Sequence, residues 1–232
     1  MPSEIELLEI ATTQIRKVAK FDPYKSYPEV GNREEFKQLI ARDPAFGVLG
    51  LDDDRYVIAR VGGNLVTSLH RKLGDLYEQL FSYLLKESFS LNENDLHFGV
   101  EVKIGDRVQY RSTDGLIRQD QFNQRIPESW RGYQGIGFEV RSCYQIGDSK
   151  RIQADYDMSL SLKAYNILPV MLVFCSTSLR SPLARLSKSW VIYEGMDCFN
   201  FVESITGFNL YKFLTDNSDI LKQEIQNIFS SF

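Results

Sequence analysis

Apolar residues recur at three- and four-residue steps in several stretches of the chain, which is the pattern of amphipathic helices. The clearest case runs from Leu65 to about Lys86, where one apolar stripe contains Leu69, Leu73, Leu76, Tyr77, Leu80 and Leu84. The same spacing predicts shorter helices over residues 4–20, 33–42, 149–165, 199–208 and 220–232. We expect Ser149 to cap the helix that begins there. Most of these helices need another element to cover their apolar side.

Alternating apolar and polar residues predict strands between these helices. Residues 96–117 alternate on both sides of Gly105-Asp106 and predict a hairpin, and residues 135–144 predict a further strand. The stretch L-P-V-M-L-V-F-C at 168–175 is apolar throughout, as expected of a central strand with helices on both of its faces. The prediction is an α/β fold with a mixed central sheet flanked by helices.

Two more short strands are expected at residues 46–51 and 56–61, separated by an acidic turn at Asp52-Asp53-Asp54. Three successive aspartates could suggest a metal-binding loop. Neighbouring side chains diverge, however, and turns favour Asp because its carboxylate bonds to nearby backbone groups. We interpret this run as a solvated turn.

Length and composition favour one large globular domain. The 232 residues include no run of 18 apolar positions, and the start, M-P-S-E-I-E, has neither the basic nor the apolar region of a secretory signal. We therefore expect a cytoplasmic protein. Cys143, Cys175 and Cys198 are odd in number and lie in or beside apolar stretches, which predicts buried free thiols. Three scattered cysteines and two histidines do not make a zinc site.

Charge is distributed unevenly along the chain. The net charge of −4 argues against a protein that simply coats nucleic acid. Residues 103–190, however, hold 13 Lys and Arg against 8 Asp and Glu. A positive cleft can exist within an acidic molecule, because exposed charges farther apart than about 8 to 10 Å are largely screened.

A pair of predicted strands brings two carboxylates and a cation to one spot. Asp114 precedes the apolar pair at 116–117, while Glu139 and Arg141 are two residues apart and so share one face of a strand. Carboxylate oxygens beside a positive group suit Mg²⁺ held next to a phosphate. The alternative is an ordinary strand pair that carries surface charges.

Two further acidic residues, Glu78 and Glu101, are candidates for the same kind of site. Glu78 lies on the flank of the long predicted helix, beside aromatic residues that could draw it into a cleft, although a solvated glutamate is the simpler interpretation. Glu101 and Lys103 form a rival carboxylate–cation pair. The nearest upstream acid, Asp95, is only six residues away and leaves no room for a preceding strand and turn, so we interpret them as an exposed face of the hairpin.

Several polar and basic positions are candidates for contact with DNA. Residues 118–134 form an insertion rich in Gln, Asn and Arg, which pair with base edges in the major groove, although a surface loop has the same composition. Residues 180–188 carry basic groups and no acid, which suits phosphates or a partner. The candidates are Asn123, Gln124, Arg125, Arg131, Gln134, Lys150, Arg151, Arg180, Arg185 and Lys188.

The order of these elements resembles the core of PD-(D/E)XK nucleases over about residues 65–175. T-D-G-L-I is similar to the family's Asp strand, F-E-V-R-S to its E-x-K-S strand, and Y-E-Q-L-F to its acidic first helix. The resemblance implies a helix, a three-stranded meander, a second helix and a fourth strand around one metal site. Asp114 and Glu139 would hold Mg²⁺, and Glu78 would hold a second ion or orient water.

Arg141 departs from the family pattern, which usually has Lys at this position. Arginine keeps the charge but does not release a proton, so it can clamp a phosphate and cannot act as a general base. Lys150, on the following turn, is the alternative source of an amine.

Outside these motifs, G-D-S-K-R-I-Q-A-D-Y-D-M and S-L-R-S-P-L-A-R-L resemble type II restriction endonucleases of the ApaLI-like group. This implies Mg²⁺-dependent double-strand cleavage at a palindrome such as GTGCAC by a homodimer. The dimer surface would use the N-terminal helices or the aromatic tail, whose rings are Phe199, Phe201, Phe208, Phe229 and Phe232. The tail could equally pack on its own core. A structure-specific repair nuclease and a noncatalytic binding module on a degraded nuclease core remain alternatives.

Overall fold

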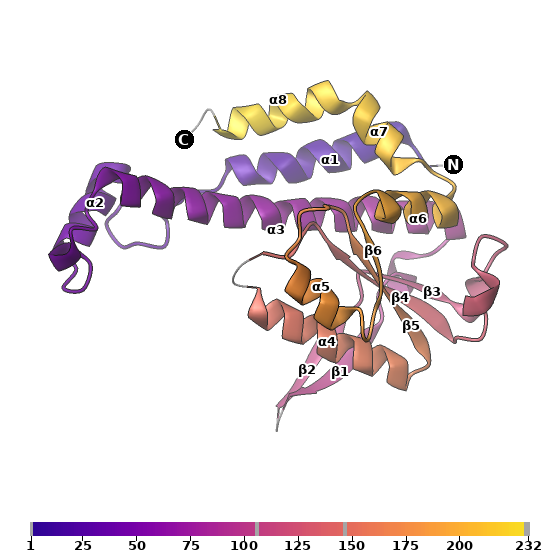
Figure 1. Cartoon of the computed structure of the whole chain (residues 1–232). Coiled ribbons are helices and arrows are strands. Elements are labelled where there is room, and N and C mark those ends of the chain that lie inside the picture. Colours follow the sequence, from indigo (N-terminus) through magenta and orange to yellow (C-terminus); the bar gives the residue numbers. More distant parts are fainter. Residues whose placement is uncertain (1, 105–106, 146–147, 230–232) are drawn as a thin grey trace.

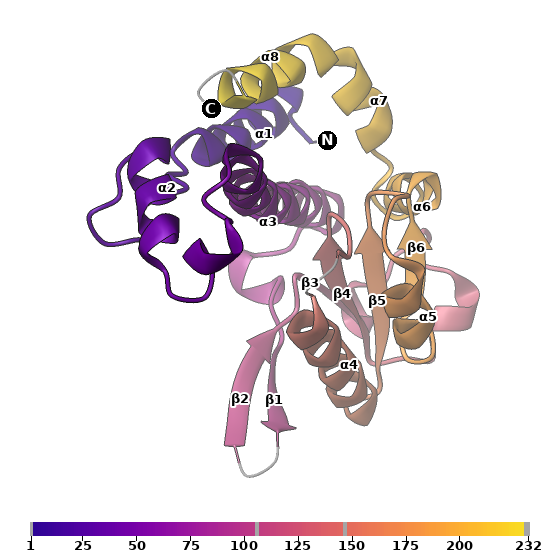
Figure 2. The same ribbon diagram turned by 60° about the vertical axis from the view of Figure 1, so that its left-hand side comes forward.

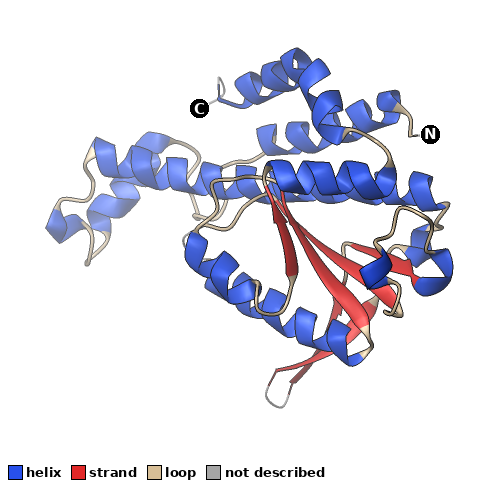
Figure 3. Cartoon of the chain, turned by 45° about the vertical axis from the view of Figure 1, so that its right-hand side comes forward, coloured by secondary structure: helices blue, strands red, loops and turns tan. Residues whose placement is uncertain are grey.

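A mixed four-stranded sheet forms the centre of the protein. The computed structural model describes residues 2–104, 107–145 and 148–229. The strand order is β3 (Gly115–Arg118), β4 (Gly135–Arg141), β5 (Ile167–Val173) and β6 (Val191–Glu194). β3 is antiparallel to β4, and the other neighbouring pairs are parallel. Helices flank this sheet (Figure 3), so the predicted α/β class with a mixed central sheet is confirmed.

Helices cover both faces of the sheet (Figure 1). α3 (Asp54–Phe89) and α6 (Met196–Thr206) pack on one face with the main hydrophobic core. α4 (Ser149–Ala164) and α5 (Arg180–Leu186) pack on the other. Every residue of β5 is buried, which agrees with the apolar run that predicted a central strand.

Alternation along β4 assigns its side chains to these two faces. Phe138 meets Phe81 of α3, with their ring centroids 5.0 Å apart. A Cβ added at Gly137 would lie 3.1 Å from Leu162 of α4, so glycine allows that helix to approach closely. Odd-numbered residues of β4 therefore face α4, and even-numbered residues face α3.

The start of α4 differs from the prediction by one residue. Asp148 is the N-cap, and Ser149 is the first helical residue, so the expected cap at Ser149 is wrong. The carboxylate of Asp148 accepts a hydrogen bond from the backbone N–H of Gln145 at 2.8 Å. That bond connects Asp148 to Gln145.

An outer layer of helices covers α3. α1 (Glu4–Ala19) packs directly on α3, and the C-terminal α7 (Leu210–Asp216) and α8 (Ser218–Phe229) follow, with α8 lying against α1 (Figure 2). Among the described residues, no helix combines the length and the apolar character needed to cross a membrane.

Most of the aromatic tail packs on its own core. Phe199, Phe201 and Phe208 all belong to the main hydrophobic cluster. Phe229 is 52% exposed, and Phe232 lies outside the described residues. The rings available for contact with a second molecule are thus fewer than the sequence suggested.

The predicted hairpin is present, but its second strand is divided. β1 (Gly99–Ile104) pairs antiparallel with β2 (Arg107–Ser112) in a sheet of their own, and the expected turn at Gly105-Asp106 lies outside the described residues. The backbone N–H of Thr113 donates to Phe98 beside β1, whereas that of Asp114 donates to Phe138 in β4. Because the chain changes partners between these two residues, the described strands do not form the continuous three-stranded meander that the resemblance implied.

Residues 24–61 form what we call the N-terminal arm, which contains α2 (Arg33–Arg42) and the first turns of α3 and extends beyond the sheet (Figure 1). The prediction of strands at residues 46–51 and 56–61 is wrong. The first stretch contains the 3-10 helix Gly47–Leu49, and the second belongs to α3.

The acidic turn explains this difference. The side chain of Asp53 accepts a hydrogen bond from the backbone N–H of Arg55 at 2.9 Å and caps α3, so the helix begins eleven residues before Leu65. Val57 then packs against Phe36 and Ile40.

Candidate active site

Asp114 and Glu139 lie next to each other at the junction of β3 and β4. The register pairs Gly115 with Phe138, and one further step places Asp114 opposite Glu139. The Oδ2 atom of Asp114 accepts a hydrogen bond from the backbone N–H of Val140 at 2.8 Å. By the alternation along β4, Glu139 and Arg141 both face α4.

The guanidinium of Arg141 joins these two carboxylates. Its Nη1 lies 3.4 Å from Oδ2 of Asp114, and its Nη2 pairs with Oε1 of Glu139. Nη1 also donates to the backbone oxygen of Val140 at 2.7 Å. Arg141 thus occupies the space between the two residues that the sequence proposed as metal ligands.

A third carboxylate, Asp155 of α4, completes the cluster and was not anticipated from the sequence. Nη2 of Arg141 lies 2.7 Å from its Oδ1. Asp155 is three residues before Met158 and seven before Leu162, which are buried on the same side of α4. An acid at a core position of an amphipathic helix is the signal that could have identified it.

The cluster contains more negative charge than positive. Three carboxylates surround one guanidinium, which leaves a formal excess of two negative charges in a region with little solvent. Burial raises the pKa of Glu139 well above its usual value, although Arg141 acts in the opposite direction. Burial also raises the pKa of Asp114, against the effects of Arg141 and the Val140 N–H. Such a site favours an additional cation.

Glu78 lies on the α3 side of this cluster. Burial, and then repulsion by Asp114 and Asp75, raises its pKa to about 7. Ser82, one turn later on α3, donates to the backbone oxygen of Asp114 at 2.9 Å. This face of the helix therefore approaches the start of β3.

The residues present fit a magnesium ion only in part. Within the part of the chain that the structure describes, no group of three or more His, Cys, Asp or Glu is arranged to hold a metal, so Glu78 does not share one cage with Asp114 and Glu139. Two carboxylates are nevertheless sufficient protein ligands for Mg²⁺, which keeps several waters. For both to bind an ion, Arg141 must give up its contacts with them.

A cavity of about 380 Å³ opens beside the cluster, and Glu139, Arg141 and Asp155 line it together with Arg111 and Arg151. Arg151 is exposed and lies 3.8 Å from Asp148. Lys150 is exposed on the same helical turn, but the described cavity is not lined by it. Arg111 is a basic residue beside the site that the sequence analysis did not select.

The candidate base-reading loop, residues 118–134, lies before the opposite end of β4 and packs against α6. Arg125 donates to the backbone oxygen of Thr206 at 2.9 Å, and Trp130 contacts Phe201 with ring centroids 5.7 Å apart.

Other polar groups of this loop bond within it. Asn123 accepts a hydrogen bond from the backbone N–H of Arg125, and Arg131 pairs with Glu128 at 3.0 Å. Gln124 and Gln134 are exposed. Asn123 and Arg131 therefore stabilise the loop's own conformation, while Arg125 attaches it to α6.

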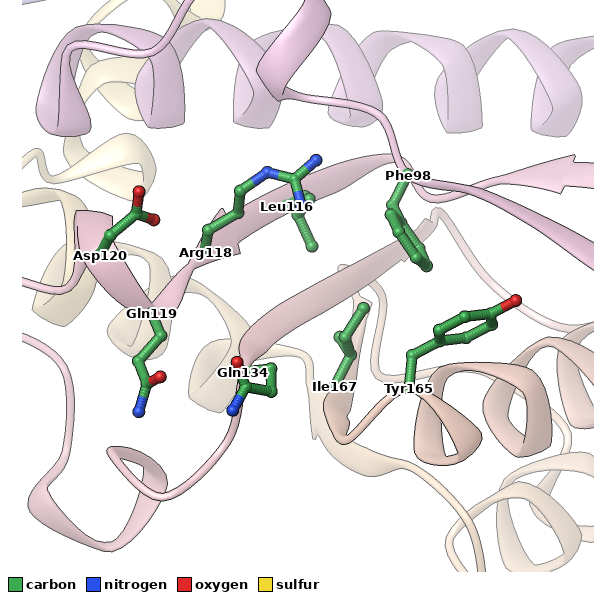
Figure 4. A pocket seen from close by; sticks show the side chains of 8 residues that line it. All are labelled: Phe98, Leu116, Arg118, Gln119, Asp120, Gln134, Tyr165 and Ile167. Atoms are coloured by element: carbon green, nitrogen blue, oxygen red, sulfur yellow. The ribbon is translucent and has the colours of Figure 1, made fainter.

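A second cavity, of about 430 Å³, lies along β3 near this loop (Figure 4). Arg118, Gln119, Asp120 and Gln134 supply its polar lining, while Phe98 and Tyr165 contribute aromatic rings. Glu139 and Arg141 do not line it in the described structure.

The basic stretch at 180–188 is largely engaged with other side chains. Arg180 pairs with Glu194 at 2.6 Å. Arg185 bonds to Gln153 and lies over the ring of Tyr156, 5.6 Å from its centroid. Lys188 is exposed.

The rival pair on the hairpin is separate from the cluster. Glu101 is exposed and accepts a hydrogen bond from Tyr110 at 2.6 Å. The side chain of Lys103 lies outside the described part of the chain.

Comparison of the chain with protein-family models, with curated proteins and with solved structures returned no match. The PD-(D/E)XK resemblance thus remains a prediction from the motifs.

Proposed function

We propose that the protein is a Mg²⁺-dependent endonuclease that hydrolyses phosphodiester bonds in double-stranded DNA. The observation that supports this best is the meeting of Asp114 and Glu139, from neighbouring strands, at one buried and overall negative cluster. Buried charge of this kind is expensive for a fold, and perturbed carboxylates of this kind are more common at functional sites than elsewhere.

Each group then has a distinct role. Asp114 and Glu139 would hold the ion, which would neutralise charge on the phosphate and lower the pKa of a water. Arg141 contacts a phosphate oxygen and stabilises its developing charge. Arg111 and Arg151, which line the adjacent cavity, attract the neighbouring phosphates. Glu78, near Asp114 on the α3 side of the cluster, would orient the attacking water.

Cleavage of both strands at a palindrome would require two copies of the chain. One site of this kind cuts one strand, so a homodimer whose twofold axis matches that of the DNA is the simplest arrangement. Sedimentation on a cognate duplex tests this part: a complex with only one copy contradicts it.

The experiment for the function is digestion of a supercoiled plasmid with Mg²⁺, using the wild type, Asp114→Asn, Glu139→Gln and the control Glu101→Gln. We expect discrete fragments from the wild type and the control, and a loss of at least about 100-fold in rate from each site variant. Nicks that depend on DNA structure rather than sequence would indicate a repair nuclease. Full activity in either site variant would overturn the assignment.

A noncatalytic binding module is the second candidate, and the position of Arg141 favours it. The guanidinium lies where a cation between Asp114 and Glu139 would lie, and it neutralises part of their charge. A wild-type protein that leaves the plasmid intact with Mg²⁺, Mn²⁺ and Co²⁺, yet retards DNA in a gel, would support this alternative.

A further inference from the structure

The three carboxylates around Arg141 are not equally accessible. The side chain of Asp155 is 3% exposed, compared with 8% for Glu139 and 15% for Asp114. Asp155 is therefore the most deeply buried of the three carboxylates.

Asp155 also makes the most extensive contact with the arginine. Its Oδ1 lies 2.7 Å from Nη2 of Arg141, and its Oδ2 lies 3.4 Å from Nε. This two-point arrangement matches the fork of a guanidinium. Asp114 contacts Nη1, and Glu139 contacts Nη2, each through one oxygen.

Asp155 is itself held from two directions. The hydroxyl of Tyr144 donates to Oδ2 at 2.5 Å, and the indole N–H of Trp190 donates to the backbone oxygen of Asp155 at 2.8 Å. Tyr144 is 1% exposed and Trp190 is 3% exposed. Both the side chain and the backbone of Asp155 are thus fixed in the core.

The charged groups of the cluster can be divided into an ion pair, Arg141 with Asp155, and two remaining carboxylates, Asp114 and Glu139. The three carboxylates and one guanidinium carry a formal net charge of −2. If Arg141 stays with Asp155, the remaining Asp114 and Glu139 carry two negative charges, which is the complement of one divalent cation.

We infer that Asp155, fixed by Tyr144, is a positioning residue that keeps Arg141 at the site when Asp114 and Glu139 bind a cation. Without this anchor, the guanidinium would remain on Asp114 and Glu139 and compete with the ion. The inference depends on the proposed function for the identity of the cation, a divalent metal. The planar fork of arginine suits a two-point carboxylate anchor, which a compact ammonium would not match.

The first test needs no metal. In ¹⁵N-labelled protein in EDTA, the Nε–H signal of Arg141 is assigned by its loss in Arg141→Lys, and its exchange rate with water is measured. Because Nε faces Asp155, we expect exchange to be about tenfold faster in Asp155→Asn and intermediate in Tyr144→Phe, which removes one hydrogen bond to Asp155.

Matched variants separate anchoring from general loosening of the fold. Asp114→Asn, Glu139→Gln and Tyr110→Phe, which removes the exposed hydrogen bond to Glu101, should each leave the exchange rate within about twofold. If Asp155→Asn does not fold, Tyr144→Phe alone decides, because it keeps the charge of Asp155 and the whole ring of residue 144 and removes only the hydroxyl. Equal rates in the wild type and in Tyr144→Phe, or equal acceleration by Asp114→Asn, would overturn the inference.

Addition of saturating Mg²⁺ completes the experiment. The Nε–H signal should persist in the wild type and broaden beyond detection in Tyr144→Phe. Loss of the signal in Mg²⁺-loaded wild type would show that the arginine leaves its anchor, which contradicts the inference while leaving the nuclease proposal intact. A wild type that binds no Mg²⁺ would instead remove the proposed function.

Discussion

The N-terminal arm and the sheet region differ in which side chains they bury: the sheet region buries charged groups, whereas the arm exposes apolar ones. The sheet region buries Asp155, Glu139 and most of Arg141 beneath helices on both faces. The arm leaves apolar side chains in solvent, with Val48 80% and Leu49 71% exposed, and has only a small cluster around Phe36. The large hydrophobic core of the sheet region contributes enough stability to offset the cost of buried charge, whereas the small cluster of the arm does not.

This difference indicates where the molecule carries specific chemistry. Arg141 pairs with carboxylates from β4, from α4 and from the residue before β3. A fold gains little net stability from such groups, because their desolvation offsets their attraction. Their presence in the best-packed region is therefore better explained by a role in binding or catalysis.

The largest expected effect is that of Arg141→Ala. Removal of the guanidinium leaves three carboxylates buried together, and breaking a buried ion pair by removing one partner costs about 3–5 kcal/mol. Urea unfolding in EDTA measures this loss. Arg180→Ala is the control, because its pair with Glu194 is exposed and should contribute less than about 1 kcal/mol. Equal losses from the two variants would remove the contrast between buried and exposed charge.

Phe36→Ala tests whether the arm opens by itself. Phe36 is 2% exposed within the arm's own cluster, so truncation should cost about 3 kcal/mol locally. Because few contacts connect this cluster to the sheet, amide exchange should accelerate over α2 and the first turns of α3 while β4 and β5 keep their protection. Uniform acceleration across the whole chain would show that arm and sheet unfold as one unit.

The same two regions differ in how well the sequence predicted them. β5 and α4 were predicted well because an unbroken apolar run and a helical stripe each specify one environment. Residues 56–61 were assigned to a strand because a short apolar run has no clear period, and the helix cap at Asp53 decided the outcome.

The candidate site was predictable only in part. Asp114, Glu139 and Arg141 come from a local pattern on adjacent strands, and the structure brings them together. Asp155 was missed because its role depends on how α4 packs against β4, which no local pattern specifies. The cluster is a tertiary arrangement, whereas the motif is a property of two strands.

A smaller effect concerns the pH dependence of stability in the sheet region. The folded-state pKa of Glu78 is raised from 4.5 to about 7, first by burial and then by Asp114. Between these two pKa values the folded protein keeps a proton on Glu78 that the unfolded chain releases. The contribution of Glu78 to stability is therefore fully present below pH 4.5 and is lost as the pH rises through 7. Because Glu78 is partly solvated, Glu78→Gln should stabilise the protein by only about 1 kcal/mol at pH 8.

Urea midpoints between pH 5 and pH 8 in EDTA measure this effect, with Glu101→Gln as an exposed control. The stability of Glu78→Gln should depend less on pH than that of the wild type. A steeper dependence in the variant would mean that Glu78 is stabilised in its charged form.

The smallest effect is expected at the exposed surface of the arm. Val48→Ser and Leu49→Ser remove apolar groups that are already in water, so each should change the free energy of unfolding by less than about 0.5 kcal/mol. The check is urea unfolding of dilute protein. A loss above about 1 kcal/mol would mean that these side chains are covered in solution.

The most direct test of the account is calorimetric titration of the metal-free protein with Mn²⁺, followed by the same titration of Asp114→Asn and Glu139→Gln. Because the cluster has a formal excess of two negative charges, we expect one ion per chain in the wild type and at least about tenfold weaker binding in each variant. Absence of binding in the wild type, or binding that both variants retain, would contradict the claim that this buried cluster is a metal-dependent active site.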